Sequence, residues 1–312
     1  MGMAEEQPVM KMQIDVPEEV AEVAAKPPAG EAAELAVTII RPAHGWQPVN
    51  FRELWRFREL TYFLAWRDLK ARYKQTVLGG VWALLQPLAT MAVFTIFLGK
   101  VAAAHGPGGE DPYPPYWLFV FTGMLPWTFF ANTLALSSQS VVSGANLITK
   151  VYFPRLIVPV AAVGVPLIDL AVSCGILAVL LLISGVLPGW GVLLLPLLVV
   201  GLAVASLGLG IFLAALTVAY RDFRAVIPFM IQLWLFATPA VYVQDQSLIS
   251  PRLQMLLPLN PAYGLVVNFR QAVVGGAFDF YSLAISVAVS AVLAVVGCFY
   301  FRRVERTFAD II

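Results

Sequence analysis

Charged side chains are scarce in this sequence. They make up 12% of its 312 residues, whereas hydrophobic residues make up 60%, and an ordinary soluble domain has about 25% charged residues. A surface in contact with water needs more charge than this, and a disordered chain has much lower hydrophobicity, so the composition excludes both classes. The net charge of +1 creates no field that would attract nucleic acid. The composition therefore predicts a membrane protein.

Residues that commonly bind metals or form disulfides are also few. Cys174 and Cys298 each lie inside an apolar run, which favours two buried thiols over a disulfide. His44 and His105 are far apart, and no group of His, Cys and carboxylates has the spacing of metal ligands. We therefore expect no metal and no cofactor in this chain.

The sequence lacks the common catalytic motifs. It contains no G-x-x-x-x-G-K-[ST] phosphate loop, no G-x-S-x-G and no H-E-x-x-H. The long apolar runs hold one carboxylate, Asp169, although acid–base catalysis needs titratable groups within reach of one another. No Lys or Arg lies in these runs to pair with Asp169, so we expect its side chain to be protonated or hydrogen-bonded to a serine or to the backbone; a pore-lining role is the alternative. These absences argue against an enzyme and predict that a partner supplies any energy for transport.

Residues 1–45 differ in kind from the rest. Their first 40 positions hold eight acidic and two basic side chains among many alanines and prolines. Such a segment buries too little apolar surface to offset the entropy of ordering it. It also lacks the basic start and apolar core of a secretory signal. We expect an acidic, disordered tail.

Residues 46–76 carry an aromatic stripe beside a basic flank when they are placed on a helix. The stripe comprises Phe51, Trp55, Tyr62, Trp66, Leu69 and Tyr73, and the flank comprises Arg52, Arg56, Arg67, Lys70 and Lys74. Aromatic rings at headgroup depth and cations near phosphates are typical of a helix in the membrane interface, with a break near residues 59–61. An ordinary amphipathic helix packed on protein is the alternative.

Residues 77–312 contain charge-free runs long enough to cross a bilayer. The run from 156 to 220 is too long for one helix and divides at the turn signal of residues 184–189. The predicted spans are residues 80–99, 116–136, 156–183, 192–220, 225–243 and 281–301. The predicted fold is therefore an all-α, polytopic membrane protein with six transmembrane helices.

Prolines interrupt residues 244–280. Pro258 and Pro261 disfavour a simple crossing there. With six spans, most Lys and Arg residues fall on one side together with both termini, whereas a seventh span would place the basic C-terminus outside. We therefore expect a re-entrant or interfacial element on the outer side, and both termini in the cytoplasm.

Five segments together resemble one family. They are Arg67–Lys74, Leu78–Pro87, Phe153–Arg155, Tyr220–Arg224 and Leu259–Pro261, and their order and spacing are similar to those of polysaccharide ABC exporter permeases of the type-2 ABC export family, of the O-antigen, capsule and teichoic-acid kind. The resemblance covers residues 50–312.

The resemblance implies a permease subunit without catalytic residues, in a bacterial cytoplasmic (inner) membrane. Two copies pair, two copies of a separate ATPase bind ATP and Mg, and the cargo is a lipid-linked polysaccharide. Alternatives are a membrane enzyme of glycolipid synthesis such as a polymerase or acyltransferase, an exporter of another amphipathic lipid or drug, and a passive channel or scaffold.

The loop after the second predicted span favours a short helix of about two turns, because Asn146 is a good N-cap and Pro154 disfavours helix at Phe153. The resemblance implies that this helix is the coupling helix, which lies in a cleft of the ATPase. It also implies a second contact with the ATPase after the fourth span. The expected coupling residues are Asn146, Leu147, Ile148, Lys150, Val151, Tyr152, Arg155, Arg221, Asp222, Phe223 and Arg224. Turns that lie on lipid are the alternative.

Aromatic side chains suit a sugar polymer, because sugar C–H groups pack on aromatic rings. The predicted cargo path comprises Trp82, Gln86, Phe94, Phe97, Phe229, Gln232 and Phe236. Lipid-facing or helix-packing aromatics are the alternative. The cations expected to guide the cargo's phosphate-bearing head are Arg67, Lys70, Arg72 and Lys74.

Overall fold

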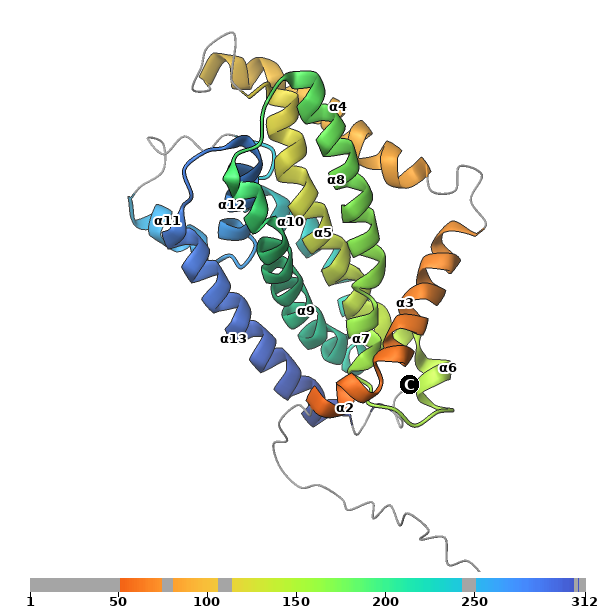
Figure 1. Cartoon of the computed structure of the whole chain (residues 1–312). Coiled ribbons are helices and arrows are strands. Elements are labelled where there is room, and N and C mark those ends of the chain that lie inside the picture. The colour runs from red at the N-terminus through yellow and green to blue at the C-terminus, as the bar shows by residue number, and fades with distance from the viewer. Residues whose placement is uncertain (1–50, 75–80, 106–113, 243–250, 306–307, 309–312) are drawn as a thin grey trace, which may run out of the picture. The chain divides into compact units, whose positions relative to one another are not determined.

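The structure is a computed structural model that describes residues 51–74, 81–105, 114–242, 251–305 and 308. Every regular element in these ranges is a helix (Figure 1). The all-α prediction is therefore confirmed for the described part of the chain. The predicted acidic tail lies outside the described residues.

Four helical segments are long and apolar enough to cross a membrane. They are α5 (Tyr116–Ser143), α7 and α8 together (Ile157–Ser184), η1 and α9 together (Trp190–Ala219), and α13 (Phe280–Val304). They coincide with the second, third, fourth and sixth predicted spans. α5 continues seven residues beyond the predicted end at 136, because Ser138 and Ser140 donate to carbonyls one turn earlier, at 2.8 and 2.7 Å, and so remain inside the helix.

The other two predicted spans are helices with shorter apolar parts. α4 runs over Val81–His105 and contains Pro87, but its apolar part is Leu84–Gly99. α10 covers Phe223–Phe236 and ends seven residues before the predicted 243. The structure thus supports four spans by length and composition, and six remain a prediction.

Two helices make up the described part of the predicted amphipathic segment. α2 covers Phe51–Arg56 and α3 covers Arg58–Tyr73, with the break at Phe57 rather than at residues 59–61. The backbone of Phe57 leaves helical geometry at φ −95° and ψ 18°. α3 then packs on α7 and α8, with Leu64 buried in that contact region.

The core of the described residues forms around α5, which packs on α9, α4, α8 and α12, while α13 lies along α9 (Figure 1). The α9–α13 contact depends on two glycines. A Cβ atom on Gly297 would lie 2.2 Å from the carbonyl oxygen of Gly208, so the two backbones touch only because neither residue has a side chain.

Non-spanning helices lie between α10 and α13. They are α11 (Pro251–Leu256), η2 (Leu257–Leu259) and α12 (Tyr263–Val274). α12 ends at Gly275, whose φ of 85° suits a residue without a Cβ. Asn268 donates from its amide to the carbonyls of Gly264 and Asp279, at 2.7 and 3.0 Å, and so fixes the start of α13 against α12. Residues 251–274 thus form short helices, and a re-entrant or interfacial element on the outer side remains a prediction.

Candidate functional site

The predicted coupling helix is shorter than the sequence indicated. α6 covers only Ala145–Ile148, and its N-cap is Gly144 rather than Asn146. The N-cap assignment was wrong because α5 continues to Ser143, which leaves Asn146 inside the first turn of the next helix. Residues 149–155 continue as turns and bends.

Exposure divides the predicted coupling residues into two groups. Tyr152 is 91% exposed and Val151 is 52% exposed, whereas Ile148 is buried in the cluster formed by α7, α9 and α13. Ile148 was therefore wrongly assigned to a docking face, because its own chain covers it. Phe153 is buried in the same cluster and anchors the loop. Tyr152 is therefore the most exposed large hydrophobic side chain of this loop.

The loop is tied to the end of α13. The Nη1 atom of Arg155 donates to the backbone carbonyl of Glu305, and the Arg302 guanidinium lies 3.7 Å from the Glu305 carboxylate. Burial raises the pKa of Glu305, and the two arginines oppose that shift. An open surface hollow of about 600 Å³ lies here, and its charged lining residues are Glu53, Lys150, Arg155, Arg302 and Glu305.

The second predicted contact lies at the start of α10. Tyr220, Arg221, Asp222 and Arg224 are exposed. Phe223 is half-buried, packs against the core, and its ring lies 6.4 Å from that of Tyr220. The structure therefore has a charged turn around a partly covered aromatic ring.

The predicted cargo residues lie on α4 and α10. Six of the seven are exposed in this chain, and Phe94 packs against the core. Phe97 is 76% exposed, and Phe229 and Phe236 are 61% and 65% exposed. These two helices thus carry aromatic rings on faces that the described residues do not cover.

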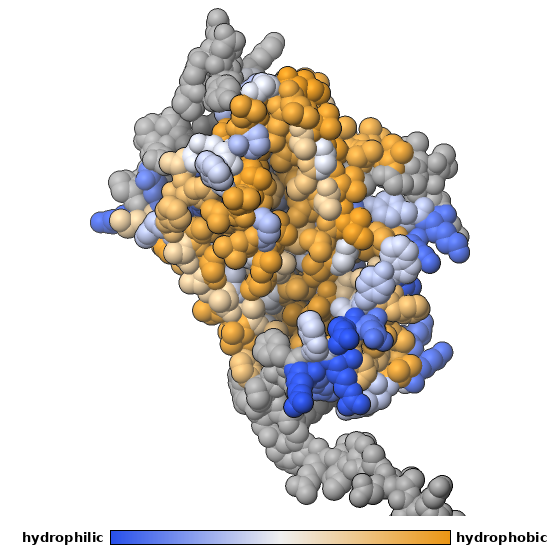
Figure 2. Space-filling model, in the orientation of Figure 1, coloured by the Kyte–Doolittle hydropathy of each residue, from blue (hydrophilic) through white to orange (hydrophobic). Residues whose placement is uncertain are grey.

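The cations of α3 have individual partners. Arg67 forms an ion pair with the adjacent Asp68 at 2.8 Å, and the Lys70 ammonium lies 5.3 Å from the centre of the Trp66 ring. Trp66 in turn stacks on Tyr62. Figure 2 shows charged side chains gathered at the end of the molecule where α2 and α3 lie, next to the apolar surface of the bundle.

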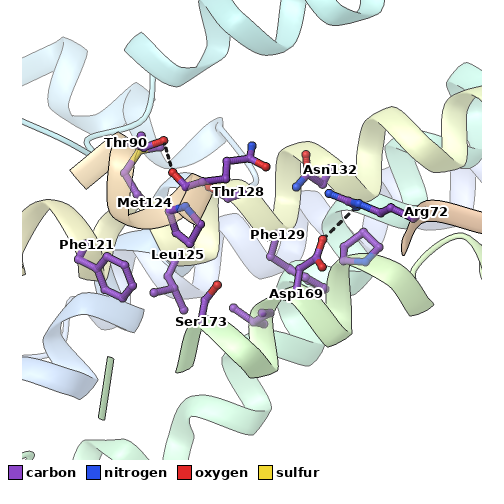
Figure 3. A pocket seen from close by; sticks show the side chains of 14 residues that line it. Arg72, Thr90, Phe121, Met124, Leu125, Thr128, Phe129, Asn132, Asp169 and Ser173 are labelled. Atoms are coloured by element: carbon purple, nitrogen blue, oxygen red, sulfur yellow. Dashed lines mark hydrogen bonds and ion pairs between the residues drawn. The ribbon is translucent and has the colours of Figure 1, made fainter. Parts of the chain in front are cut away.

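Arg72 is another of the four cations predicted to guide the cargo, and its contact with Asp169 corrects the expectation that this carboxylate has no cationic partner. The Arg72 guanidinium lies 3.0 Å from one carboxylate oxygen of Asp169 (Figure 3). The hydroxyl of Tyr73 donates to the other oxygen at 2.5 Å. Burial and this hydrogen bond raise the pKa of Tyr73 to about 12. The partner of Asp169 lies outside the predicted spans, in α3, 97 residues away in the sequence. Asp169 therefore joins α3 to α8.

Sequence reasoning missed the role of Arg270. Its side chain is buried, and its Nη2 atom donates to the carbonyls of Pro239 and Ala240 at 2.7 and 2.8 Å. The guanidinium lies 3.8 Å from the centre of the Phe119 ring. Gly123 makes room, because a Cβ there would lie 2.0 Å from the Ala240 oxygen.

Two more side chains bind the same stretch of backbone. The Tyr116 hydroxyl donates to the carbonyl of Val241 at 2.7 Å, and the Asn260 amide donates to that of Ala237 at 3.2 Å. We call Tyr116, Asn260 and Arg270 the carbonyl clamp. The clamp explains why α10 ends at Phe236: side chains take over the carbonyls that a longer helix would pair internally.

Comparisons with known proteins identify the family. Residues 59–274, well over half of the chain, match the family described as ABC-2 type transporter. The chain belongs to this family. It is 32% identical over 223 residues to the O-antigen export system permease protein RfbA of Myxococcus xanthus, a match that covers 70% of this chain and 82% of that protein. It is 26% identical over 250 residues to the protein of the same description from Klebsiella pneumoniae, which covers 79% of this chain and 92% of that protein.

Membership of this family makes the chain a transporter component rather than an enzyme. The matched region extends from α3 to the end of α12. It therefore includes the Arg72–Asp169 pair, the loop with Tyr152 and the carbonyl clamp.

Proposed function

We propose that this chain is the permease subunit of an ATP-driven exporter that moves a lipid-linked polysaccharide across a bacterial inner membrane. The observation that carries the proposal is the match to O-antigen export permeases over most of their length, up to 92% of one relative. Because the match is nearly end to end, it supports the whole role and not only a shared domain.

The proposed assembly contains two copies of this chain and two copies of an ATPase that binds ATP and Mg. The support in this chain is the loop of residues 149–155, where Tyr152 is 91% exposed while its neighbour Phe153 is buried. A rigidly anchored, protruding aromatic residue is typical of an interface hot spot. The charged turn of residues 220–224 forms the second contact.

The proposed topology has six spans, both termini in the cytoplasm, and α11 and α12 on the outer side. α2 and α3 lie in the cytoplasmic interface, which the exposed rings of Trp55 and Tyr62 support, each 70% exposed. Cysteines placed at Thr149 and Ala277, in a background without Cys174 and Cys298, test this topology. They should react with an impermeant thiol reagent from opposite sides, and labelling from the same side contradicts six spans.

The proposed cargo path runs along the exposed aromatic faces of α4 and α10, with Arg67, Lys70 and Lys74 of α3 near the cargo's phosphate-bearing head. Aromatic rings pack on sugar rings without fixing one hydroxyl pattern, which suits a long repeating polymer. Arg72 also pairs with Asp169, so it joins α3 to α8 in addition to any contact with cargo.

The decisive experiment is co-purification with a candidate ATPase, followed by ATP turnover in lipid vesicles and glycan export in cells. A retained ATPase and export that requires both proteins support the proposal. Retention of the ATPase without glycan export points to another amphipathic cargo. An ATPase that does not bind the chain contradicts the proposal.

A further inference from the structure

A pocket opens between α4, α5 and α8, next to the last turn of α3 (Figure 3). The enclosed space has a volume of about 50 Å³, whereas a single water needs roughly 10–15 Å³ of such space. It therefore admits a phosphate-sized group or part of one acyl chain, and it is too small for consecutive sugar rings. Gln86 of the proposed cargo path lines this pocket, whereas the exposed aromatic rings of that path lie elsewhere on α4 and α10.

Charged and polar side chains gather mainly at one end of the pocket, although Phe129 lies among them and Thr90 lies near the other end. Figure 3 shows Arg72, Asn132 and Asp169 close together at one end, while Phe121 and Leu125 lie at the opposite end. Ser173 and Thr128 lie between the two. A pocket of this kind fits an amphipathic ligand with one compact polar group.

The side chain of Arg72 can bind a further group. Each Asp169 oxygen already accepts one partner, Arg72 at 3.0 Å and Tyr73 at 2.5 Å. The contact with Asp169 is through Nη1 of Arg72, and a guanidinium carries five N–H donors in a planar fork that matches phosphate oxygens. Asp169 thus holds the Arg72 guanidinium at the pocket, and the donors that remain on Arg72 can bind a ligand anion.

The place of the pocket indicates where the ligand comes from. Arg72 belongs to α3, which under the proposed topology lies at the depth of the lipid headgroups, and α8 continues from Asp169 for fifteen residues toward the other end of the bundle. A lipid whose phosphate reaches Arg72 would have its chain directed along apolar helix surfaces.

We propose that this pocket binds the phosphate group of a membrane lipid, with Arg72 as the phosphate-binding residue, Asp169 as its positioning residue and Asn132 as a second polar contact. The lipid is either a bulk phospholipid or the lipid carrier of the cargo, because both present the same phosphate chemistry. The inference uses the proposed placement of α3 in the interface, but lipid binding does not require that the chain export polysaccharide.

The test is photo-crosslinking of the full-length protein in vesicles that contain a photoactivatable phosphatidylglycerol, with the labelled peptides identified by mass spectrometry. Labelling should map to α4, α5 and α8 around the pocket. Arg72→Gln should reduce it by about tenfold, the loss expected when a charge-assisted contact of roughly 1.4 kcal/mol is removed. The matched control is Arg58→Gln, because Arg58 is an exposed cation on the same helix that stacks on Trp55 away from the pocket lining; it should leave labelling unchanged.

A second variant separates binding from the anchoring of α3. Asn132→Leu keeps the Arg72–Asp169 pair and fills the polar end of the pocket, so labelling should fall while the melting temperature stays near the wild-type value. Equal labelling of wild type, Arg72→Gln and Asn132→Leu overturns the proposal, as does labelling that never maps to the pocket helices.

The source of the phosphate is decided by native mass spectrometry of protein from cells with and without the lipid-linked glycan. A phospholipid retained from both cell types and lost in Asn132→Leu identifies a bulk lipid. A phosphate-bearing carrier retained only from glycan-producing cells identifies the cargo. Retention of no phosphate lipid from either cell type overturns the proposal, whereas failure of the proposed function would appear separately, as loss of ATPase binding with lipid binding intact.

Discussion

The two ends of the described helical bundle differ in how far their polar side chains are buried. At the α12 end, Arg270 is buried and donates to the backbone of residues 239 and 240. At the α3 end, the side chains of Arg72 and Asp169 are 37% and 16% exposed, and Tyr152 is 91% exposed. The polar side chains at the α12 end are buried and complete the fold, whereas those at the α3 end are partly or largely exposed.

The difference has a physical cause. Irregular backbone among apolar residues leaves carbonyls that water cannot reach, and each must receive a donor from the protein. The break after α10 creates such carbonyls, and the carbonyl clamp supplies the donors. The loop with Tyr152 lies at the surface, so its groups can remain available to a partner.

Removal of Arg270 should have the largest effect on the fold. Arg270→Ala leaves two buried carbonyls without donors and empties the space beside Phe119. The free energy of unfolding should therefore fall by about 3 kcal/mol or more. Arg252→Ala, at an exposed position of α11, is the control and should change little. The measurement is the melting temperature in detergent. Equal melting temperatures for the two variants would show that the buried Arg270 does not stabilise the α12 end of the bundle.

Adjacent residues in the coupling loop should separate folding from partner binding. Tyr152→Ala should weaken ATPase association by about 2 kcal/mol, or roughly 30-fold, and leave stability unchanged because the side chain is exposed. Phe153→Ala should lower stability by about 3 kcal/mol because that ring is buried. Binding to immobilised ATPase and thermal unfolding are the two measurements. If Tyr152→Ala destabilises the chain and leaves ATPase binding intact, Tyr152 belongs to the fold.

The link between α3 and α8 should have an intermediate effect. A double-mutant cycle of Arg72→Gln and Asp169→Asn should give a coupling energy of about 1 kcal/mol, since the pair is only partly exposed. The same cycle on Arg67 and Asp68, a neighbouring pair with side chains 48% and 39% exposed, should give about 0.5 kcal/mol or less. Equal coupling energies would mean that Asp169 does not anchor α3.

Neutralising the exposed cations of α3 should have the smallest effect on the fold. Arg67, Lys70 and Lys74 replaced together by glutamine should alter the free energy of unfolding by less than about 0.5 kcal/mol, while polysaccharide export falls because the cationic flank is lost. Arg58→Gln again serves as the control. Normal export by the triple variant would show that these cations do not guide the cargo.

The sequence by itself determined the features that depend on local composition. Four apolar runs became four helices long enough to cross a membrane, because crossing requires only length and the absence of charge. The five family-like segments also identified the family correctly, since they are read directly from the sequence. The exposed Tyr152 lies within the loop that the sequence selected.

Only the tertiary structure decided which polar groups meet and which apolar groups are covered. Asp169 pairs with Arg72, 97 residues away in the sequence. Ile148 is buried by helices that are distant in the sequence. α10 ends at Phe236 because Arg270 and the other residues of the carbonyl clamp bind the carbonyls beyond it. None of these contacts leaves a periodic signal, because each depends on where another helix passes. Local patterns fix helices, whereas partners of single polar side chains are fixed by packing.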